Sequence, residues 1–145
     1  MRLVLPEPLR EAIADRAKAA FPAECCGLVE GMRDQSGFSV TRIHPAHNLA
    51  GAANRFEIDP KDHIAAAKEA RARGARLIGC YHSHPNGRAE PSELDRARAP
   101  EEDFLWLIAA TDGERCEIGA FVYRGPGFAE PLGADCVTSS VKVLR

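Results

Sequence analysis

The chain has 145 residues, of which 45% are hydrophobic, and its 19 basic and 21 acidic residues leave a net charge of −2. Because a chain of this length buries roughly 70% of its unfolded surface on folding, it can hold a core unaided, and we expect a single domain over residues 1–145. The near balance of charges gives no electrostatic footprint for nucleic acid or an anionic membrane, so neither is expected as a partner.

The N-terminus and the cysteines indicate a cytoplasmic protein. The apolar run at residues 1–6 stops too early for a secretory signal, no small-residue cleavage site follows it, and no other run approaches the length of a membrane span. The cysteines are odd in number and form no CxxC pair, which favours buried, reduced thiols over disulfides. These thiols belong to Cys25, Cys26, Cys80, Cys116 and Cys136.

The first third of the chain predicts a helix followed by a β-hairpin. An amphipathic helix is expected over residues 6–21 and ends at Pro22. Residues 25–32 and 38–44 are rich in apolar side chains and flank a turn cluster at 34–37, a pattern typical of two antiparallel strands. The apolar positions that recur on one face of the helix are Leu9, Ile13, Ala17 and Ala20.

A loop, a short strand and a second helix are predicted next. Residues 45–54 are rich in glycine and alanine, and a long loop in a compact domain often bounds a functional cleft. A short strand is expected at 56–58. Asp59 is an N-cap residue type and Pro60 suits a first helical turn, so the second helix begins there and stops at Gly74.

A strand, a loop and one helical turn then carry the candidate chemistry. The apolar run at 77–81 predicts a strand that leads into His82 and His84, and alternate strand residues point to one face, so the two imidazoles project together from its end. Proline, asparagine and glycine force a loop after the strand. Ser92, an N-cap residue type, opens a short helical turn that brings Asp95 back towards the histidines.

Two histidines and one aspartate supply three ligands, the number that leaves the fourth tetrahedral position of a catalytic zinc ion free for water. A closed structural site would need a fourth ligand, usually cysteine, and none stands at suitable spacing. An HxH pair alone is more often two strand-end histidines, and the addition of Ser92 and Asp95 favours a metal centre. One Zn²⁺ per chain suits these ligands, with iron or cobalt left open. The remaining histidines are expected on the surface or packed in loops: His44, His47 and His63.

Further strands are predicted beyond this region. The apolar run at 104–109 is typical of a central strand, and a turn signal at 111–114 separates it from a strand at 117–123. Residues 137–144 have the β-branched composition of a last strand, whereas the charged, proline-containing stretch 96–103 predicts a connector or a frayed helix. The order of elements predicts an α+β fold with a curved, mostly antiparallel sheet flanked by helices.

The metal-ligand region also carries a family resemblance. His82-Ser83-His84, seven intervening residues, Ser92, two more and Asp95 match the H-[ST]-H-x7-S-x2-D signature of the JAMM (MPN+, Mov34/PAD-1) metalloproteases. Upstream, residues 22–31 resemble the family's element of glutamate followed by Cys-Gly. The segment from Asn48 to Pro60 resembles its N…RF-x-IDP connection. The resemblance implies the JAMM/MPN, cytidine-deaminase-like sandwich.

The resemblance implies a reaction as well. His82, His84 and Asp95 would hold zinc, which lowers the pKa of bound water from 15.7 towards about 7. Glu24 would accept the proton of that water and deliver it to the leaving amine, and Ser92 would donate a hydrogen bond to the developing oxyanion. The plainer interpretations are a surface carboxylate for Glu24 and a pure N-cap for Ser92. A serine nucleophile at Ser92 lacks triad partners at suitable spacing.

The family resemblance also implies a substrate. Members cut peptide or isopeptide bonds next to the C-terminal Gly-Gly of ubiquitin-like proteins, and compact bacterial ones resemble enzymes that trim small sulfur-carrier proteins. This chain lacks room for the insertions that hold ubiquitin chains, so we expect a peptidase acting on the tail of a ubiquitin-fold sulfur carrier, and we leave a homodimer open. The alternatives are a cell-wall peptide hydrolase of the phage-tail type and a non-catalytic MPN scaffold, although every ligand position is filled here. A nucleobase deaminase is disfavoured because its HxE and PCxxC pattern is absent.

Overall fold

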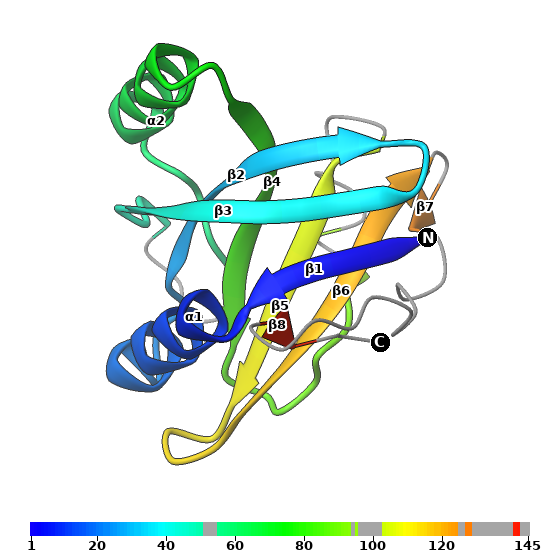
Figure 1. Cartoon of the computed structure of the whole chain (residues 1–145). Helices are drawn as coiled ribbons and strands as arrows, with labels where there is room; N and C mark the ends of the chain where they lie inside the picture. Colours follow the sequence, from blue (N-terminus) through cyan, green and yellow to red (C-terminus); the bar gives the residue numbers. More distant parts are fainter. Residues whose placement is uncertain (51–54, 94, 96–102, 125–126, 129–140, 143–145) are drawn as a thin grey trace.

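One mixed sheet and two helices make up the described part of the chain (Figure 1). The computed structural model describes residues 1–50, 55–93, 95, 103–124, 127–128 and 141–142. Within these ranges the elements are β1 (Arg2–Pro6), α1 (Glu7–Ala20), β2 (Cys26–Asp34), β3 (Gly37–Ala46), α2 (Pro60–Ala72), β4 (Arg76–His84), β5 (Leu105–Thr111), β6 (Cys116–Arg124), β7 (Gly127–Phe128) and β8 (Val141–Lys142).

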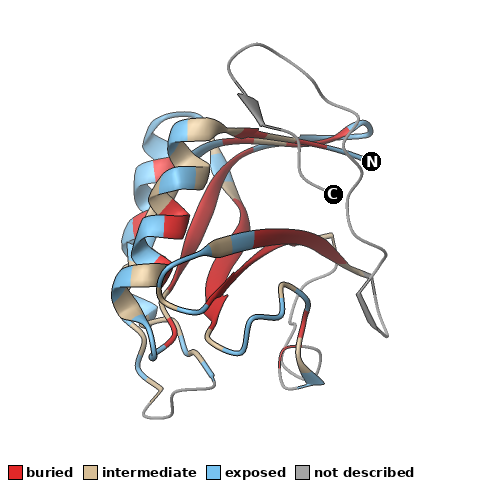
Figure 2. Ribbon diagram, turned by 90° about the horizontal axis from the view of Figure 1, so that it is seen from below, coloured by how far each residue is buried: buried red, intermediate tan, exposed pale blue. Residues whose placement is uncertain are grey.

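The described strands form one sheet in the order β7-β6-β5-β4-β2-β3-β1-β8. Two neighbouring pairs, β1 with β3 and β4 with β5, run parallel, and the other described pairs run antiparallel. The sheet is strongly curved (Figure 2). The predicted α+β fold with a curved, mostly antiparallel sheet is therefore confirmed.

The two helices cover opposite faces of the sheet. Successive strand residues point to opposite sides, so Leu105 and Leu107 of β5 pack in one cluster with Ile13 of α1. Trp106 and Ile108 turn the other way and share a second cluster with Ala66 of α2. Buried residues accordingly run along the central strands and the inner sides of the helices, while the outer sides of the helices are exposed (Figure 2).

Helix bounds follow the local signals closely. α1 ends at Ala20, next to the predicted stop, but Pro6 belongs to β1 and the helix begins one residue later than expected. In α2 the side chain of Asp59 accepts a hydrogen bond from the backbone N–H of Lys61 at 2.9 Å, as the predicted N-cap requires. Gly74 lies beyond its C-terminus at φ +72°, a left-handed conformation that glycine adopts without strain.

Several local predictions need correction. β1 was not expected, and it forms because Leu3 and Leu5 alternate into the core while its backbone pairs with β3. The strand expected at 56–58 is wrong, because this segment makes only an isolated bridge from Ile58 to Asn48. Of the strand expected at 137–144, only Val141–Lys142 falls within the described residues, and of the stretch 96–103 only Asp103 does.

The cysteine prediction holds in part. Cys26 and Cys80 are buried thiols that form no disulfide, whereas Cys25 and Cys116, likewise outside any disulfide, are only half-buried. Cys136 lies outside the described residues.

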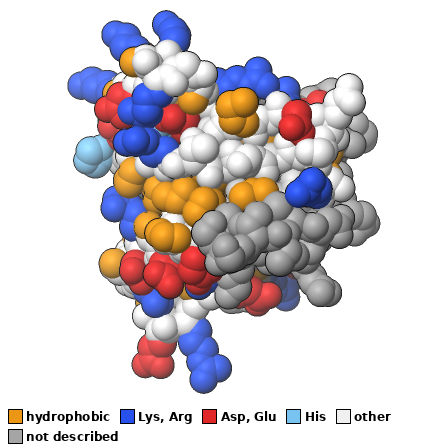
Figure 3. All heavy atoms as spheres, in the orientation of Figure 1, with side chains coloured by type: hydrophobic (Ala, Val, Ile, Leu, Met, Phe, Trp, Pro, Cys, Tyr) orange, Lys and Arg blue, Asp and Glu red, His pale blue; other side chains and the backbone are white. Residues whose placement is uncertain are grey.

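The surface is mixed in charge. Lys and Arg side chains are interspersed with Asp and Glu on the face drawn in Figure 3, as the near balance of charges suggests. Within the described ranges, neither α1 nor α2 combines the length and the hydrophobicity of a transmembrane span.

A buried carboxylate ties α2 to the sheet. Glu30 on β2 is only 2% exposed, and its oxygens accept hydrogen bonds from Arg73 at 2.6 and 3.1 Å. Nε2 of His44 on β3 lies 2.8 Å from the same carboxylate. The Arg73 guanidinium, with His44, holds the pKa of Glu30 at about 2, well below its ordinary value. Arg73 directly follows α2, so this cluster joins the helix to two strands.

We expect Glu30→Gln to destabilise the fold in a pH-dependent way. The lowered folded-state pKa means that the ionised carboxylate stabilises the fold fully above its unfolded pKa of about 4.3, and that this contribution is lost as the pH falls through about 2. The difference in unfolding free energy between parent and variant should be on the order of 3 kcal/mol near pH 6 and should shrink towards pH 2. Denaturant unfolding across this range measures it, and a difference independent of pH would contradict the assignment.

Candidate metal centre

The two candidate histidine ligands lie at the end of a central strand. β4 pairs antiparallel with β2, where His82 faces Cys26, and parallel with β5, where His84 faces Ala110. His82 is fully buried and His84 is 4% exposed. Their Nε2 atoms lie 2.9 Å apart, so the two imidazoles do share one face, as the alternation of strand residues predicts.

The loop after β4 returns the aspartate to these histidines. Oδ2 of Asp95 lies 3.2 Å from Nε2 of His82 and 3.0 Å from Nε2 of His84. The backbone N–H of Ser92 donates to the same Oδ2 at 2.8 Å, and the backbone N–H of Asp95 donates to Oγ of Ser92 at 3.0 Å. Ser92 therefore acts as the predicted N-cap, and these reciprocal bonds hold the carboxylate in place.

The packing of this loop against β6 needs a glycine. A Cβ atom built on Gly119 would collide with the backbone carbonyl of Ala89. A side chain at this position would push the loop away from the sheet, and Asp95 lies at the far end of that loop. Gly119 thus contributes to the site without touching it.

The converging atoms fit a metal ion. Nδ1 of His84 lies 2.9 Å from the carbonyl oxygen of Arg88, which can only accept, so Nδ1 carries a proton and the neutral ring presents the lone pair of Nε2. Nε2 of His84 points at Oδ2 of Asp95 and at Nε2 of His82, and these three atoms lie within 3.2 Å of one another. When protonated, the ring nitrogens donate to Oδ2 of Asp95, and when deprotonated they can bind a cation, since two imidazole nitrogens with one carboxylate oxygen are typical zinc ligands.

The electrostatics of His82 and Asp95 agree with this fit, whereas the raised pKa of His84 means that a cation would compete with a proton at its Nε2. Burial lowers the pKa of His82 and so favours the neutral ring that a metal needs. Burial alone would raise the pKa of Asp95, but the hydrogen bonds with His82 and His84 outweigh it and hold that pKa far below its ordinary value. For His84, Asp95 and the Arg88 carbonyl outweigh the effect of burial and raise its pKa.

Glu24 lies beside the two histidines with its carboxyl group buried. It precedes β2, is 5% exposed, and contributes an oxygen that lies with the ring nitrogens of His82 and His84 in a group whose atoms are all within 4.8 Å of one another. Its Oε1 is buried and has no hydrogen-bond partner among the described residues. Burial raises the pKa of Glu24 to about 7, against the opposing effect of His84, a value suited to taking up and releasing a proton.

Aromatic rings that the sequence interpretation left out of the site enclose His82. The ring of Phe56 stacks on this imidazole with centroids 4.2 Å apart and planes at 18°. Trp106 of β5 meets it edge-on at 5.6 Å. One signal in the sequence indicated a role of Phe56 at the site, because this residue belongs to the RF-x-IDP segment. The contact of Phe56 with His82, however, depends on the path of the chain through residues 48–58.

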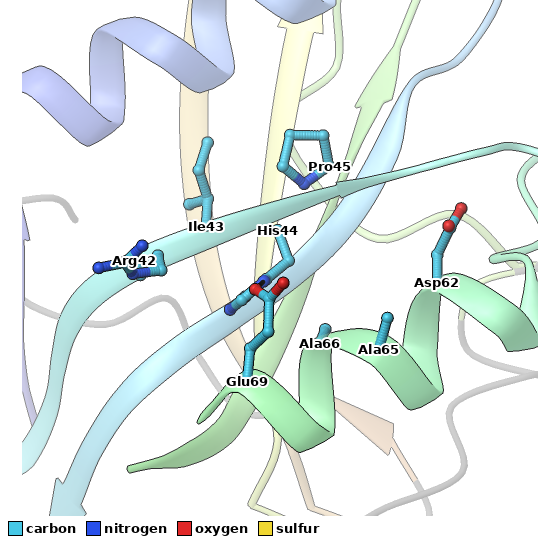
Figure 4. Close-up of a pocket in the computed structure, with 8 residues that line it drawn as sticks. All are labelled: Arg42, Ile43, His44, Pro45, Asp62, Ala65, Ala66 and Glu69. Carbon is cyan, nitrogen blue, oxygen red and sulfur yellow. Dashed lines mark ion pairs between the residues drawn. The ribbon is translucent and has the colours of Figure 1, made fainter. Parts of the chain in front are cut away.

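The other histidines lie away from the centre. His44 packs against Glu30, and His63 is exposed. His47 is exposed and forms a second group of potential ligand atoms with Asp59 and Asp62, although Asp62 already accepts hydrogen bonds from the backbone and ring of His47. A cavity of about 340 Å³ lies next to this group, between β3 and α2, and Nδ1 of His44 and Oε2 of Glu69, 3.4 Å apart, form part of its wall (Figure 4).

Comparison with protein families agrees with this arrangement. The family of prokaryotic homologs of the JAB domain matches residues 6–121. A desampylase from Haloferax volcanii is 33% identical over 134 residues, which cover 89% of this chain and 93% of the relative. A probable TtuB-protein conjugate cleaving protease from Thermus thermophilus is 32% identical over 118 residues, covering 78% and 73%.

A phage protein matches over a shorter part of its length. Tail tip assembly protein K of Escherichia phage N15 is 33% identical over 101 residues, which cover 69% of this chain but 37% of that protein. This chain therefore spans little more than a third of the phage relative.

Solved structures share the fold. The solution structure of a protein from Desulfitobacterium hafniense superposes with a TM-score of 0.79 at 30% identity, covering 88% of both chains. A structure described as a JAMM metalloprotease-like zinc site in the proteasome and signalosome has a TM-score of 0.53 at 16% identity, covering 92% of this chain and 93% of its own. The second likeness concerns the fold alone.

We expect Asp95→Ala to lower zinc affinity by at least about 100-fold, because it removes a ligand rather than an outer partner, whose loss already costs 10–100-fold. Competition with a zinc-binding dye measures this affinity. Asp62→Ala is the matched control, because it removes a carboxylate from the second group of potential ligands and should leave zinc binding intact. Retention of zinc by Asp95→Ala, or its loss from Asp62→Ala, would show that the ligand set is wrong.

Proposed function

The chain belongs to the family of prokaryotic homologs of the JAB domain, within the JAMM/MPN metalloproteases, and on this premise we propose that it is a zinc-dependent peptidase acting next to the C-terminal Gly-Gly of a ubiquitin-like protein. This membership confirms the resemblance predicted from the H-[ST]-H-x7-S-x2-D signature. The chain is accordingly an enzyme, a hydrolase of the JAMM type.

One observation supports the proposal more than any other. Nε2 of His82, Nε2 of His84 and Oδ2 of Asp95 converge within 3.2 Å, and the buried carboxylate of Glu24 lies beside them. His82, His84 and Asp95 would hold the zinc ion, and Glu24 is left free to act on protons. A non-catalytic scaffold has no use for this arrangement, which leaves a buried carboxylate oxygen unsatisfied at a cost in stability.

The residues of the chain then have distinct roles in amide hydrolysis. A bound zinc ion would supply a water molecule whose pKa is lowered towards neutrality. Glu24 takes the proton from the attacking water and passes it to the nitrogen of the leaving amine. The Oγ of Ser92 accepts a hydrogen bond from the backbone N–H of Asp95. The hydroxyl proton of Ser92 is therefore left to donate to the carbonyl oxygen of the substrate as that oxygen becomes negative.

The substrate proposal draws on two relatives. The Thermus relative is named for the cleavage of TtuB-protein conjugates and the Haloferax relative for desampylation. We extend conjugate cleavage to this chain, with a small ubiquitin-fold sulfur carrier as the partner and its C-terminal Gly-Gly at the cleaved bond. A single domain over residues 1–145, a cytoplasmic location and a homodimer stay predictions from the sequence.

A cell-wall peptide hydrolase of the phage-tail type is the second candidate. The match to tail tip assembly protein K favours it, but the matched region covers only 37% of that protein. The substrates separate the two candidates, because one cuts behind a folded ubiquitin-like protein and the other cuts a short cell-wall peptide.

The test of the proposal is mass spectrometry of a ubiquitin-fold sulfur carrier extended by two residues beyond its Gly-Gly end. Zinc-loaded parent should remove the extension, and Glu24→Gln should keep its zinc and lose about 10²–10⁴-fold in turnover, because it cannot accept a proton. A peptidoglycan stem peptide is the parallel substrate. If the stem peptide is cut and the carrier is left uncut, the phage-type candidate is favoured. Equal turnover by the parent and by Glu24→Gln would show that Glu24 is not the base.

We expect Ser92→Ala to lower turnover by about 10²–10³-fold through loss of the oxyanion donor. Zinc content should not change, because the bond from residue 92 to Asp95 Oδ2 comes from the backbone N–H. Ser92→Thr retains a hydroxyl and is the control. Turnover of Ser92→Ala near that of the parent would limit Ser92 to its N-cap role.

A further inference from the structure

The peptide unit that joins Glu24 to Cys25 is held on both sides by side chains from elsewhere in the chain. Its carbonyl oxygen, that of Glu24, accepts a hydrogen bond from Nδ2 of Asn48 at 3.0 Å. Its N–H, that of Cys25, donates to Oγ of Ser83 at 2.8 Å. Because a peptide unit is planar, these two bonds fix its orientation, and with it the backbone direction from which the Glu24 side chain leaves.

Asn48 uses its whole amide in this arrangement. Its Oδ1 accepts from the backbone N–H of Ala50 at 3.0 Å and of Glu57 at 2.9 Å, and Nδ2 also donates to the carbonyl of Arg55 at 3.3 Å. All four partners are backbone groups with a fixed donor or acceptor character, so the orientation of the amide is unambiguous. Asn48 thus fastens the chain on either side of residues 51–54 to the backbone of Glu24.

Ser83 holds the other side of the same peptide. It is fully buried and lies between the two histidines of β4, so its side chain points away from theirs. Besides the bond from Cys25 N–H to its Oγ, its own N–H donates to the carbonyl of Cys25 at 3.0 Å. These two hydrogen bonds between Cys25 and Ser83 continue the pairing of β2 with β4 one residue beyond Cys26 and His82.

We propose that Asn48 and Ser83 are positioning residues for Glu24, an inference that rests on the proposed role of Glu24 as the base. The buried Oε1 of Glu24 has no hydrogen-bond partner among the described residues, so its placement depends on the backbone rather than on a bond to the carboxylate. The two bonds to the peptide supply that placement. Without either one the peptide can rotate, and the carboxylate moves relative to the histidines.

Turnover and zinc content test this role in two variants. Asn48→Asp keeps Oδ1 for Ala50 and Glu57 but replaces the donor to the Glu24 carbonyl, and Ser83→Ala removes the acceptor for Cys25. With the extended carrier as substrate, each should lower kcat by about 10²-fold, the scale of a 1 Å misplacement, with KM and zinc content close to those of the parent.

Matched controls separate placement from other effects. Ser83→Thr keeps the hydroxyl that accepts from the Cys25 N–H, so its kcat should stay near that of the parent. Asn86→Asp introduces the same charge in the loop after His84 without touching the Glu24 peptide, and should leave kcat near that of the parent. In a Glu24→Gln background, Asn48→Asp and Ser83→Ala should cause no further loss. The full loss in that background, or loss of zinc, would overturn the proposal and assign both residues to general stability.

Amide hydrogen exchange tests the arrangement independently of activity. The Cys25 amide should be protected in the parent and in Ser83→Thr, and should exchange at least about tenfold faster in Ser83→Ala, because its acceptor is gone. Unchanged protection in Ser83→Ala would overturn the proposal. If the parent cleaves neither the carrier nor the cell-wall peptide, the proposed function fails, while the exchange experiment still decides whether this peptide is held as described.

Discussion

The antiparallel pairing of β2 with β4 is the constraint on which the site depends. β2 begins where β4 ends, with Cys26 opposite His82, so the residue pair just beyond brings Cys25 to Ser83. Glu24 and the two histidines are almost sixty positions apart in the chain, yet this register places them at one end of the sheet. A shift by one residue would turn both imidazoles to the opposite face and separate them from Asp95.

Two buried glutamates show how the fold sets the chemistry of one residue type. Glu30 lies within β2 and is met by Arg73 and His44, so its pKa falls to about 2 and it stays ionised as a structural anion. Glu24 lies just before the same strand, has a carboxylate oxygen with no hydrogen-bond partner among the described residues, and has a pKa raised to about 7. The paired carboxylate stabilises the fold, whereas the unpaired one is costly to bury and is suited to exchanging protons.

The segment from Asn48 to Ile58 serves the centre in two ways. Its first residue holds the backbone of Glu24, and Phe56 stacks on His82. Base and ligand are therefore supported by one connection between β3 and α2, and the isolated bridge from Asn48 to Ile58 closes it. The described residues on either side of 51–54 are held together by the side-chain amide of Asn48, which bonds backbone groups of Ala50, Arg55 and Glu57.

Features that depend on neighbouring residues could be predicted from the amino-acid pattern alone. The spacing of His82 and His84 dictates a shared face of a strand, Ser92 and Asp95 form a helical turn with reciprocal caps, and Asp59 with Gly74 bounds α2. Each of these follows from backbone geometry within a few residues, which a sequence pattern records directly. The family signature is such a pattern, and it located the three candidate ligands.

Contacts between distant segments could not be predicted in this way, because they follow from the folded arrangement of the sheet. Four features depend on strand register and on the path of the loops. They are the parallel pairing of β1, the ion pair of Glu30 with Arg73, the stacking of Phe56 on His82, and the hydrogen bonds from Asn48 and Ser83 to one peptide unit. No local pattern encodes them, because the same residues would suit a solvated surface equally well. They form here because a buried polar group must find a partner, and the packed sheet determines which partner lies within reach.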